Sequence, residues 1–161
     1  MATISVGSGN YLRPYRNVDV RNYPEDASQT FKRGDILIFS STSGKEDKVK
    51  LAGADPTAKL IGVAAADASG VEGTTIPVWL FTERSEFRIH YVDTQTVSRA
   101  DINVSYGVAR DATNLIWRLD NTETTAKVFE VVQLLDAHGD VNGAVVVRPT
   151  TATQKLVFGA N

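Results

Sequence analysis

Histidine is the side chain best suited to acid–base catalysis near neutral pH, and this sequence contains two of them. His90 lies in the segment from Glu86 to Tyr91, where polar and apolar residues alternate as in a half-buried strand. The alternation places His90 on the polar face with Glu86 and Arg88. We therefore expect His90 to be a solvated surface residue and not a general base.

The second histidine belongs to a loop in which possible cation ligands alternate: Asp136, His138, Asp140 and Asn142. An EF-hand calcium loop places glycine at its sixth position and a carboxylate at its twelfth. Counted from Asp136, these positions hold Val141 and Val147, and counted from His138 the twelfth residue is Pro149. Neither register fits, so the loop is predicted to be a polar hairpin turn. Whether it binds an ion stays open, and no cofactor or metal is expected.

Serine hydrolase chemistry would require a nucleophilic serine on a Gly-x-Ser-x-Gly turn, near a histidine and an aspartate. Gly7-Ser8-Gly9 has no predicted strand before it or helix after it, and Ser69-Gly70 reads as a turn. The sequence is therefore predicted to encode a non-enzymatic protein without catalytic residues. The tripeptide Arg33-Gly34-Asp35 matches an integrin-type motif, but its predicted role is the turn that enters a strand.

Tyrosine and arginine interleave near the N-terminus, at Tyr11, Arg13, Tyr15, Arg16, Arg21 and Tyr23. Both residue types are enriched in protein interfaces, because each combines a large contact area with directed hydrogen bonds. We interpret the six residues as a candidate interface. Stacking on single-stranded nucleic acid is a second reading, which the acidic residues Asp19, Glu25 and Asp26 weaken. Packing of the segment on its own domain is the third.

The composition narrows the classes of partner. The chain of 161 residues has the size of one domain, and its lack of cysteine excludes thiol catalysis, disulfides and cysteine-based zinc sites. A net charge of -2 gives no bulk attraction to nucleic acid or to an anionic membrane. No apolar run approaches the roughly 20 residues of a membrane span, and no secretion signal is apparent at the N-terminus. We therefore expect neither nucleic acid nor a membrane as a partner.

The elements that must position these residues are predicted to be strands, because valine and threonine outnumber leucine and favour pleated sheet. Phe87, Ile89 and Tyr91 are expected on one buried face. Leu115, Trp117 and Leu119 are expected on another, with Arg118 opposite them. Further expectations are a central strand buried on both faces at Val128–Leu135, a hairpin at Asn142-Gly143, and one helical turn within Thr96–Asp101 capped by Thr96 or Ser98. Trp79 and Trp117 are expected in the core.

The predicted fold class is all-β with a minor helix: a small antiparallel β-barrel or sandwich with an extended N-terminal arm. Residues 1–30 hold Pro14, Pro24 and many short polar residues, which favours an arm without a core of its own. Residues 31–148 form the predicted body. Residues 149–161 form a C-terminal tail, in which Lys155–Phe158 could dock as a last strand.

Within the body, one connected pattern of strands and turns extends from Phe31 to Phe81. It consists of the Gly34-Asp35 turn, Ile36–Phe39, a polar loop, Leu60–Ala64, an Asp/Gly turn from Asp67 to Gly73, and Ile76–Phe81. In strand order and turn types the chain resembles the small β-barrel decoration, or cement, proteins that bind the outside of tailed-phage heads. The resemblance covers about two-thirds of the chain.

This resemblance implies a structural protein of the virion, made in the host cytoplasm and bound to the outer capsid surface. The implied partners are the lattice of the major capsid protein and neighbouring copies of this chain, as a homotrimer. Tyr11 to Tyr23 would be the reaching segment, and deletion of residues 1–25 is expected to leave a folded barrel that binds capsids poorly. The alternatives are a head fibre base, a tail protein, or a ligand-binding β-barrel with Trp79 and Trp117 as stacking platforms.

Overall fold

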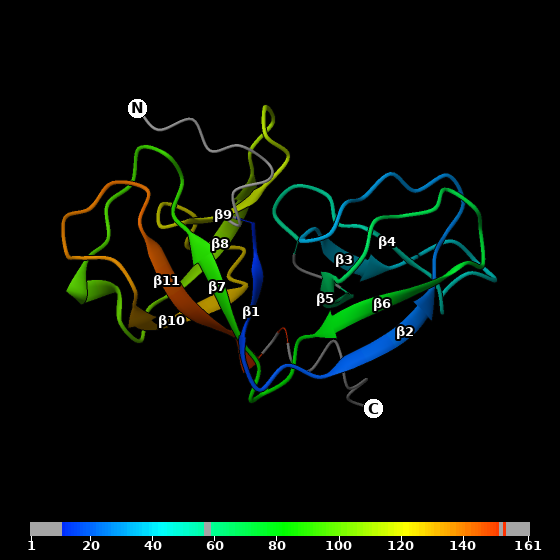
Figure 1. Ribbon diagram of the computed structural model, residues 1–161, viewed down its shortest axis with the longest axis horizontal. Coiled ribbons are helices and arrows are strands. Elements are labelled where there is room, and N and C mark those ends of the chain that lie inside the picture. The colour runs from blue at the N-terminus through cyan, green and yellow to red at the C-terminus, as the bar shows by residue number, and fades with distance from the viewer. Residues whose placement is uncertain (1–10, 57–58, 152, 154–161) are drawn as a thin grey trace.

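Two antiparallel sheets lie side by side in the computed structural model, which describes residues 11–56, 59–151 and 153 (Figure 1). The six-stranded sheet runs in the order β1 (Arg13–Arg16), β7 (Glu86–His90), β11 (Ala144–Pro149), β10 (Phe129–Leu134), β8 (Ser105–Arg110) and β9 (Trp117–Asp120). The five-stranded sheet runs in the order β2 (Val20–Pro24), β6 (Thr75–Leu80), β5 (Leu60–Ala64), β3 (Ile36–Phe39) and β4 (Val49–Leu51). The all-β prediction is confirmed, as two packed sheets and not as a closed barrel.

Several strands of the body form where the alternation of apolar residues predicts them. Phe87, Ile89 and Tyr91 are buried on one face of β7 and its continuation. β3, β5 and β6 coincide with the three apolar runs between Phe31 and Phe81. Gly62 in β5 is required by packing, because a Cβ atom there would collide with the Trp79 carbonyl group on β6.

The hydrophobic core is shared between the two sheets. One cluster combines side chains from both, among them Ile36, Leu60, Phe81, Phe87, Trp117 and Phe129. A second cluster packs on the opposite face of the five-stranded sheet, with Phe31, Leu37, Ile61 and Val78 among its members. The five-stranded sheet is therefore apolar on both faces, which explains why all five residues of β5 are buried. A parallel bridge between Glu25, just after β2, and Val49 in β4 connects the two edge strands of this sheet.

The segment predicted to be an arm differs from the expectation. Of residues 1–30, the described part from Tyr11 onward supplies β1 to the six-stranded sheet and β2 to the five-stranded sheet. Leu12 is fully buried in the shared core. An apolar anchor and two short strands thus hold this segment against the body. Residues 1–10, and the predicted last strand Lys155–Phe158, lie outside the described residues.

Two polar side chains are buried: His90, which is expected on the surface, and Arg118, which is expected only on the face opposite Trp117. His90 is only 8% exposed, because the loop before β11 folds against it and its Nδ1 lies 2.9 Å from the Asn142 carbonyl oxygen. Arg118 on β9 is 2% exposed, and its three guanidinium nitrogens find no hydrogen-bond partner among the described residues. Alternation assigns a side chain to a face, but the loops decide whether that face is covered.

The predictions for two further segments differ in part from the structure. Leu115 is 49% exposed with φ of 58°, so it does not share the buried face of Trp117 and Leu119, and β9 begins only at Trp117. β10 is central but is buried mainly on one face, and its Gln133 is exposed.

The helical turn is confirmed, and the predicted hairpin is present, but its connection spans residues 135–143 and Asn142-Gly143 only ends it. A 3-10 helix, η1 (Arg99–Asp101), follows Ser98, whose side chain accepts a hydrogen bond from the Ala100 N–H group as an N-cap. Asn142 adopts φ of 53° in the hairpin between β10 and β11, a conformation that asparagine tolerates. No helix in the described part of the chain is long and apolar enough to cross a membrane.

Candidate partner-binding surface

The structure divides the six predicted interface residues into two groups. Tyr15, Arg16 and Arg21 are exposed, with Tyr15 40% accessible. Tyr11, Arg13 and Tyr23 are half-buried. All six come from β1, β2 or the residues just before β1, so one continuous segment presents the exposed three along the margins of both sheets.

Arg16 is fixed in place by polar contacts on β1. Its Nε donates to Glu86 Oε2 at 2.7 Å, and its Nη2 donates to Gln133 Oε1 at 3.2 Å. Its guanidinium carbon lies 4.9 Å from the centre of the Tyr15 ring, within range of a cation–π contact. Tyr15 and Arg16 therefore form a preorganised pair, which lowers the entropy that a partner must overcome on binding.

The half-buried tyrosines hold the segment on its own domain. Tyr23 contacts the ring of Phe39 edge to face, with 5.5 Å between centroids. Tyr11 packs on Gly34, where an added Cβ would approach within 2.8 Å of its ring, and Arg33 stacks on it at 5.8 Å. These contacts agree with the self-packing reading for Tyr11 and Tyr23.

The turn between β1 and β2 borders a cavity of about 400 Å³, where the chain crosses between the two sheets. Its lining is polar and of mixed charge: Asn17, Val18, Asp19, Thr82, Glu83 and Arg84. Beside it Val20 is 57% exposed. We call the exposed residues Tyr15, Arg16, Asn17, Asp19, Val20 and Arg21 the β1–β2 surface. The pattern of tyrosine and arginine did not point to Val20 or Asn17.

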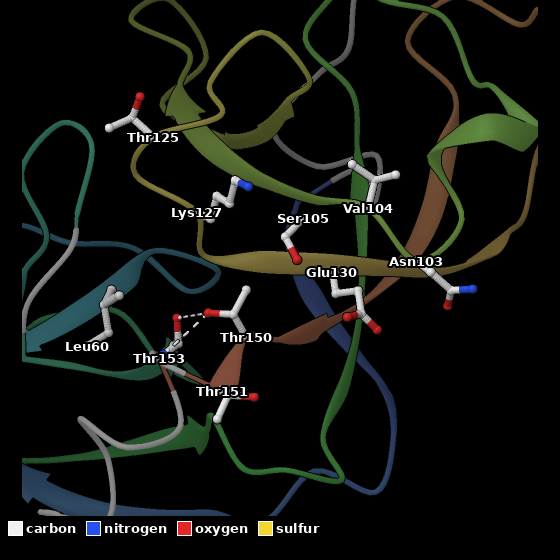
Figure 2. A pocket seen from close by; sticks show the side chains of 10 residues that line it. All are labelled: Leu60, Asn103, Val104, Ser105, Thr125, Lys127, Glu130, Thr150, Thr151 and Thr153. Carbon is white, nitrogen blue, oxygen red and sulfur yellow. Dashed lines mark hydrogen bonds between the residues drawn. The ribbon is translucent and has the colours of Figure 1, made fainter.

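A larger groove of about 680 Å³ opens where the end of β11 meets β8, β10 and Leu60 of β5 (Figure 2). Five of its lining residues carry hydroxyl groups: Ser105, Thr125, Thr150, Thr151 and Thr153. Thr153 is committed internally, since its Oγ1 donates to the Val128 carbonyl at 3.2 Å. Lys127 is an exposed cation on the rim. The groove could hold a small ligand rich in hydrogen-bonding groups, and its residues are too scattered in sequence to have been predicted.

Neither tryptophan lines this groove. Trp117 is buried, as predicted, and its Nε1 donates to Asp35 Oδ1 at 3.0 Å. Trp79 is only half-buried, and Arg33 covers its ring at 5.1 Å. Neither residue lines the groove, so the proposal that they act as ligand platforms gains no support.

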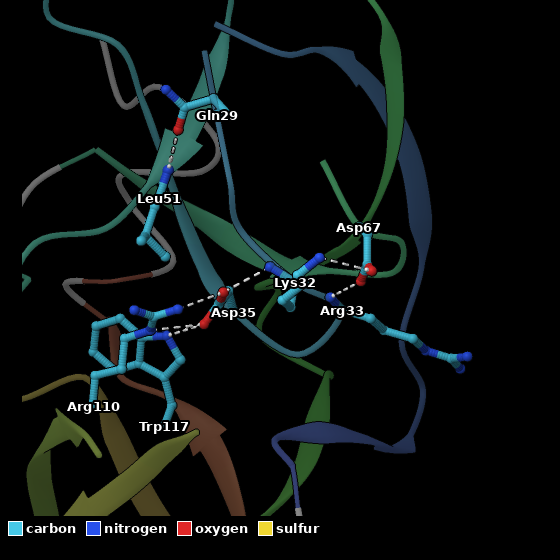
Figure 3. Close-up of polar contacts among 8 residues, drawn as sticks. All are labelled: Gln29, Lys32, Arg33, Asp35, Leu51, Asp67, Arg110 and Trp117. Carbon is cyan, nitrogen blue, oxygen red and sulfur yellow. Dashed lines mark hydrogen bonds and ion pairs between the residues drawn. The ribbon is translucent and has the colours of Figure 1, made fainter. Parts of the chain in front are cut away.

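Asp35 forms the main polar link between the two sheets (Figure 3). Arg110 from β8 donates to both of its carboxylate oxygens, from Nε at 3.0 Å and Nη2 at 2.9 Å. The Lys32 N–H group donates to Oδ2 at 2.8 Å. The Arg33-Gly34-Asp35 tripeptide is thus a structural turn, as predicted, and its aspartate is buried.

The hydrogen bonds of the two histidines in the described part of the chain involve backbone groups of Asn142 and Arg99. Burial lowers the pKa of His90, and the nearby Arg118 and Arg88 lower it further. His138 is exposed and its Nδ1 accepts from the Arg99 N–H group at 3.3 Å. The loop carboxylates hold the hairpin, as Asp136 accepts from the Ala144 N–H group at 2.7 Å. Among the described residues no three acidic or histidine side chains gather as a metal site.

A scan of the chain against protein-family models and a search of curated proteins both found no match. The interpretation of function therefore rests on the sequence pattern and on the geometry of the β1–β2 surface.

Proposed function

We propose that this protein is a non-enzymatic structural component of a tailed-phage virion, which binds the outside of the assembled capsid lattice. The observation that carries the proposal is the exposed trio Tyr15, Arg16 and Arg21 on two edge strands. Interface hot spots are rich in tyrosine and arginine, and Arg16 is already fixed beside Tyr15. The strand and turn pattern behind the resemblance to decoration proteins, realised as β3, β5 and β6, supports the same proposal.

The proposed mechanism is mechanical. A protein that binds the assembled lattice but not free subunits stabilises the lattice by mass action. Copies arranged around the lattice, for which we propose trimers, contribute together, so each contact can be weak. A compact two-sheet body with a shared core suits this role, because it presents the β1–β2 surface from a rigid support.

The test is co-sedimentation of the protein with DNA-filled heads and with unexpanded procapsids of the parent phage. Saturable binding to mature heads at a fixed ratio to the lattice is the expected result. Deletion of residues 1–25 is no longer a suitable variant, because it removes β1, β2 and the buried Leu12. Tyr15→Ala and Arg21→Ala are preferable, since both side chains are exposed.

Arg99→Ala provides a matched control, because Arg99 is an exposed arginine on η1, outside the β1–β2 surface. We expect Tyr15→Ala and Arg21→Ala each to weaken head binding about tenfold or more, as at interface hot spots. Arg99→Ala should bind normally. If all three variants bind equally, the capsid contact does not involve Tyr15 or Arg21. If the protein binds no head at all, a tail or fibre component becomes the favoured function, followed by a ligand-binding protein.

A further inference from the structure

The six-stranded sheet has one face turned toward the shared core and one face turned away from it. Phe87 and Ile89 of β7 are buried in the core, so Arg88 between them points to the other face. The same alternation holds at the start of β1, where Leu12 is buried in the core and Arg13 follows it. Figure 1 shows β1, β7 and β11 side by side in this sheet.

The register between β1 and β7 places two like charges together on this outward face. Arg13 lies directly opposite Arg88, and Arg16 lies opposite Glu86. Side chains directly opposite each other in an antiparallel pair have Cβ atoms about 4.5–5.5 Å apart. The side chains of Arg13 and Arg88 therefore begin at neighbouring points of the sheet, where like charges are destabilising.

The next two strands continue the same face. Val146 of β11 lies opposite Arg88, and Arg148 is two residues further along the same strand. Arg148 in turn lies opposite Glu130 of β10. We call the six charged residues of these four strands the arginine face: Arg13, Arg16, Glu86, Arg88, Glu130 and Arg148.

The charges of the arginine face are only partly compensated. Arg16 and Arg148 are neutralised, because each donates to a glutamate of the face at 2.7 Å. Among the described residues, the side chains of Arg13 and Arg88 form no ion pair or hydrogen bond, and Arg88 Nε is buried without a partner. The face thus carries two uncompensated positive charges, although the net charge of the chain is -2.

The chemistry of the arginine face favours carboxylates as its ligands. A guanidinium group offers parallel N–H donors, a geometry that matches a carboxylate. A nucleic acid would bring a continuous row of phosphates, which the two glutamates of the face and the net charge of -2 oppose. A protein surface presents separate carboxylates, and these can bind Arg13 and Arg88 while Glu86 and Glu130 stay in their own ion pairs.

We propose that the arginine face is a docking surface for an acidic protein surface, whose carboxylates bind between Arg13 and Arg88. Binding would remove the repulsion between the two guanidinium groups, which is a cost already present in the free protein. Under the proposed function, on which this assignment of the partner rests, the acidic surface belongs to the capsid lattice. Arg16 lies on both the arginine face and the β1–β2 surface, so one partner can contact the two together.

A charge reversal at Arg13 separates binding from folding. Arg13→Glu places a carboxylate opposite Arg88, a favourable cross-strand pair, so the melting temperature should stay the same or rise. Binding to DNA-filled heads should nevertheless weaken about tenfold or more. Arg13→Gln removes the charge without reversing it, and should weaken binding by a smaller factor.

Arg99→Glu is the matched control, because it makes the same change in net charge at an exposed arginine outside the arginine face. It should bind heads normally. Equal binding by Arg13→Glu and Arg99→Glu would overturn the proposal. A loss of binding that accompanies a lower melting temperature in both Arg13 variants would also overturn it, since Arg13 would then have a structural role.

A short polyglutamate peptide tests the arginine face without any capsid. In NMR titrations of the full-length protein, the peptide should shift the amide signals of β1 and β7 in a saturable way, and added salt should weaken this binding. Arg13→Glu should abolish these shifts. Shifts confined to other strands, or tighter binding of single-stranded DNA of equal charge, would overturn the proposal. If the native protein binds no head, the proposed function is contradicted, whereas this titration still decides on the docking surface.

Discussion

At the scale of single residues, Asp35 has the largest predicted effect on stability. It is buried, and both carboxylate oxygens accept hydrogen bonds, two of them from Arg110 and one from Trp117. Asp35→Ala leaves the guanidinium without its counter-charge and the indole N–H without an acceptor. We expect the free energy of unfolding, measured in urea, to fall by about 3–5 kcal/mol.

Asp67→Ala is the matched control for this change. Asp67 lies in the same region and accepts from the Arg33 N–H group at 2.9 Å, but its side chain is 56% exposed (Figure 3). Its loss should cost about 1 kcal/mol, the usual contribution of one hydrogen bond. Similar losses for the two variants would show that burial of Asp35 between the sheets is not the source of its effect.

His90 predicts a pH dependence of stability. Burial lowers its pKa in the folded protein. The contact with the Asn142 carbonyl opposes this effect, Arg118 and Arg88 lower the pKa further, and Asp136 raises it, with a net lowering. Below the ordinary pKa of 6.5 the unfolded chain therefore takes up the proton first. Stability should be complete above pH 6.5 and fall as the pH drops from there toward the folded pKa.

Urea titrations across this range check the expectation with two variants. His90→Gln should flatten the decline in unfolding free energy below pH 6.5, because glutamine does not titrate. His138→Gln is the matched control, because it replaces the other histidine, whose side chain is exposed. If the decline persists in His90→Gln and disappears in His138→Gln, the pH dependence comes from His138 and the prediction is wrong.

At the scale of elements, the sequence predicted the inner strands better than the edges. β3, β5 and β6 are apolar because their side chains fill the two core clusters. Such burial requires a run of apolar residues, which can be recognised in the sequence. β2 pairs along its length with β6 alone and meets β4 only at its end, at the Glu25–Val49 bridge, and its first three residues are exposed. Such an edge strand needs no run of apolar residues, and for this reason the sequence of residues 1–30 predicted an extended arm instead of a strand.

The candidate surface was predictable only in part for a similar reason. The interleaved tyrosines and arginines identified the correct segment, yet Tyr11 and Tyr23 proved to be anchored against Arg33 and Phe39. Which aromatic side chain faces inward depends on neighbours far away in sequence. Alternation predicted the face of β9 on which Arg118 lies, but the local pattern cannot show that other parts of the chain cover that face.

At the scale of the whole molecule, the two sheets should unfold together. Their shared cluster contains Ile36 and Leu60 from one sheet and Phe87 and Phe129 from the other, and Asp35 adds a polar link. Neither sheet retains a complete core without its neighbour. Calorimetry should therefore give one transition with equal calorimetric and van't Hoff enthalpies, and two resolved transitions would contradict this view.

The placement of β1 and β2 also has a consequence for synthesis on the ribosome. These strands emerge first, but Arg13 pairs with Arg88 and Val20 pairs with Trp79, so their partners are translated seconds later. Contacts this distant along the chain close slowly. β1 and β2 are therefore expected to stay unpaired until β6 and β7 have been synthesised, which leaves these two strands accessible to chaperones and to other nascent copies in the meantime.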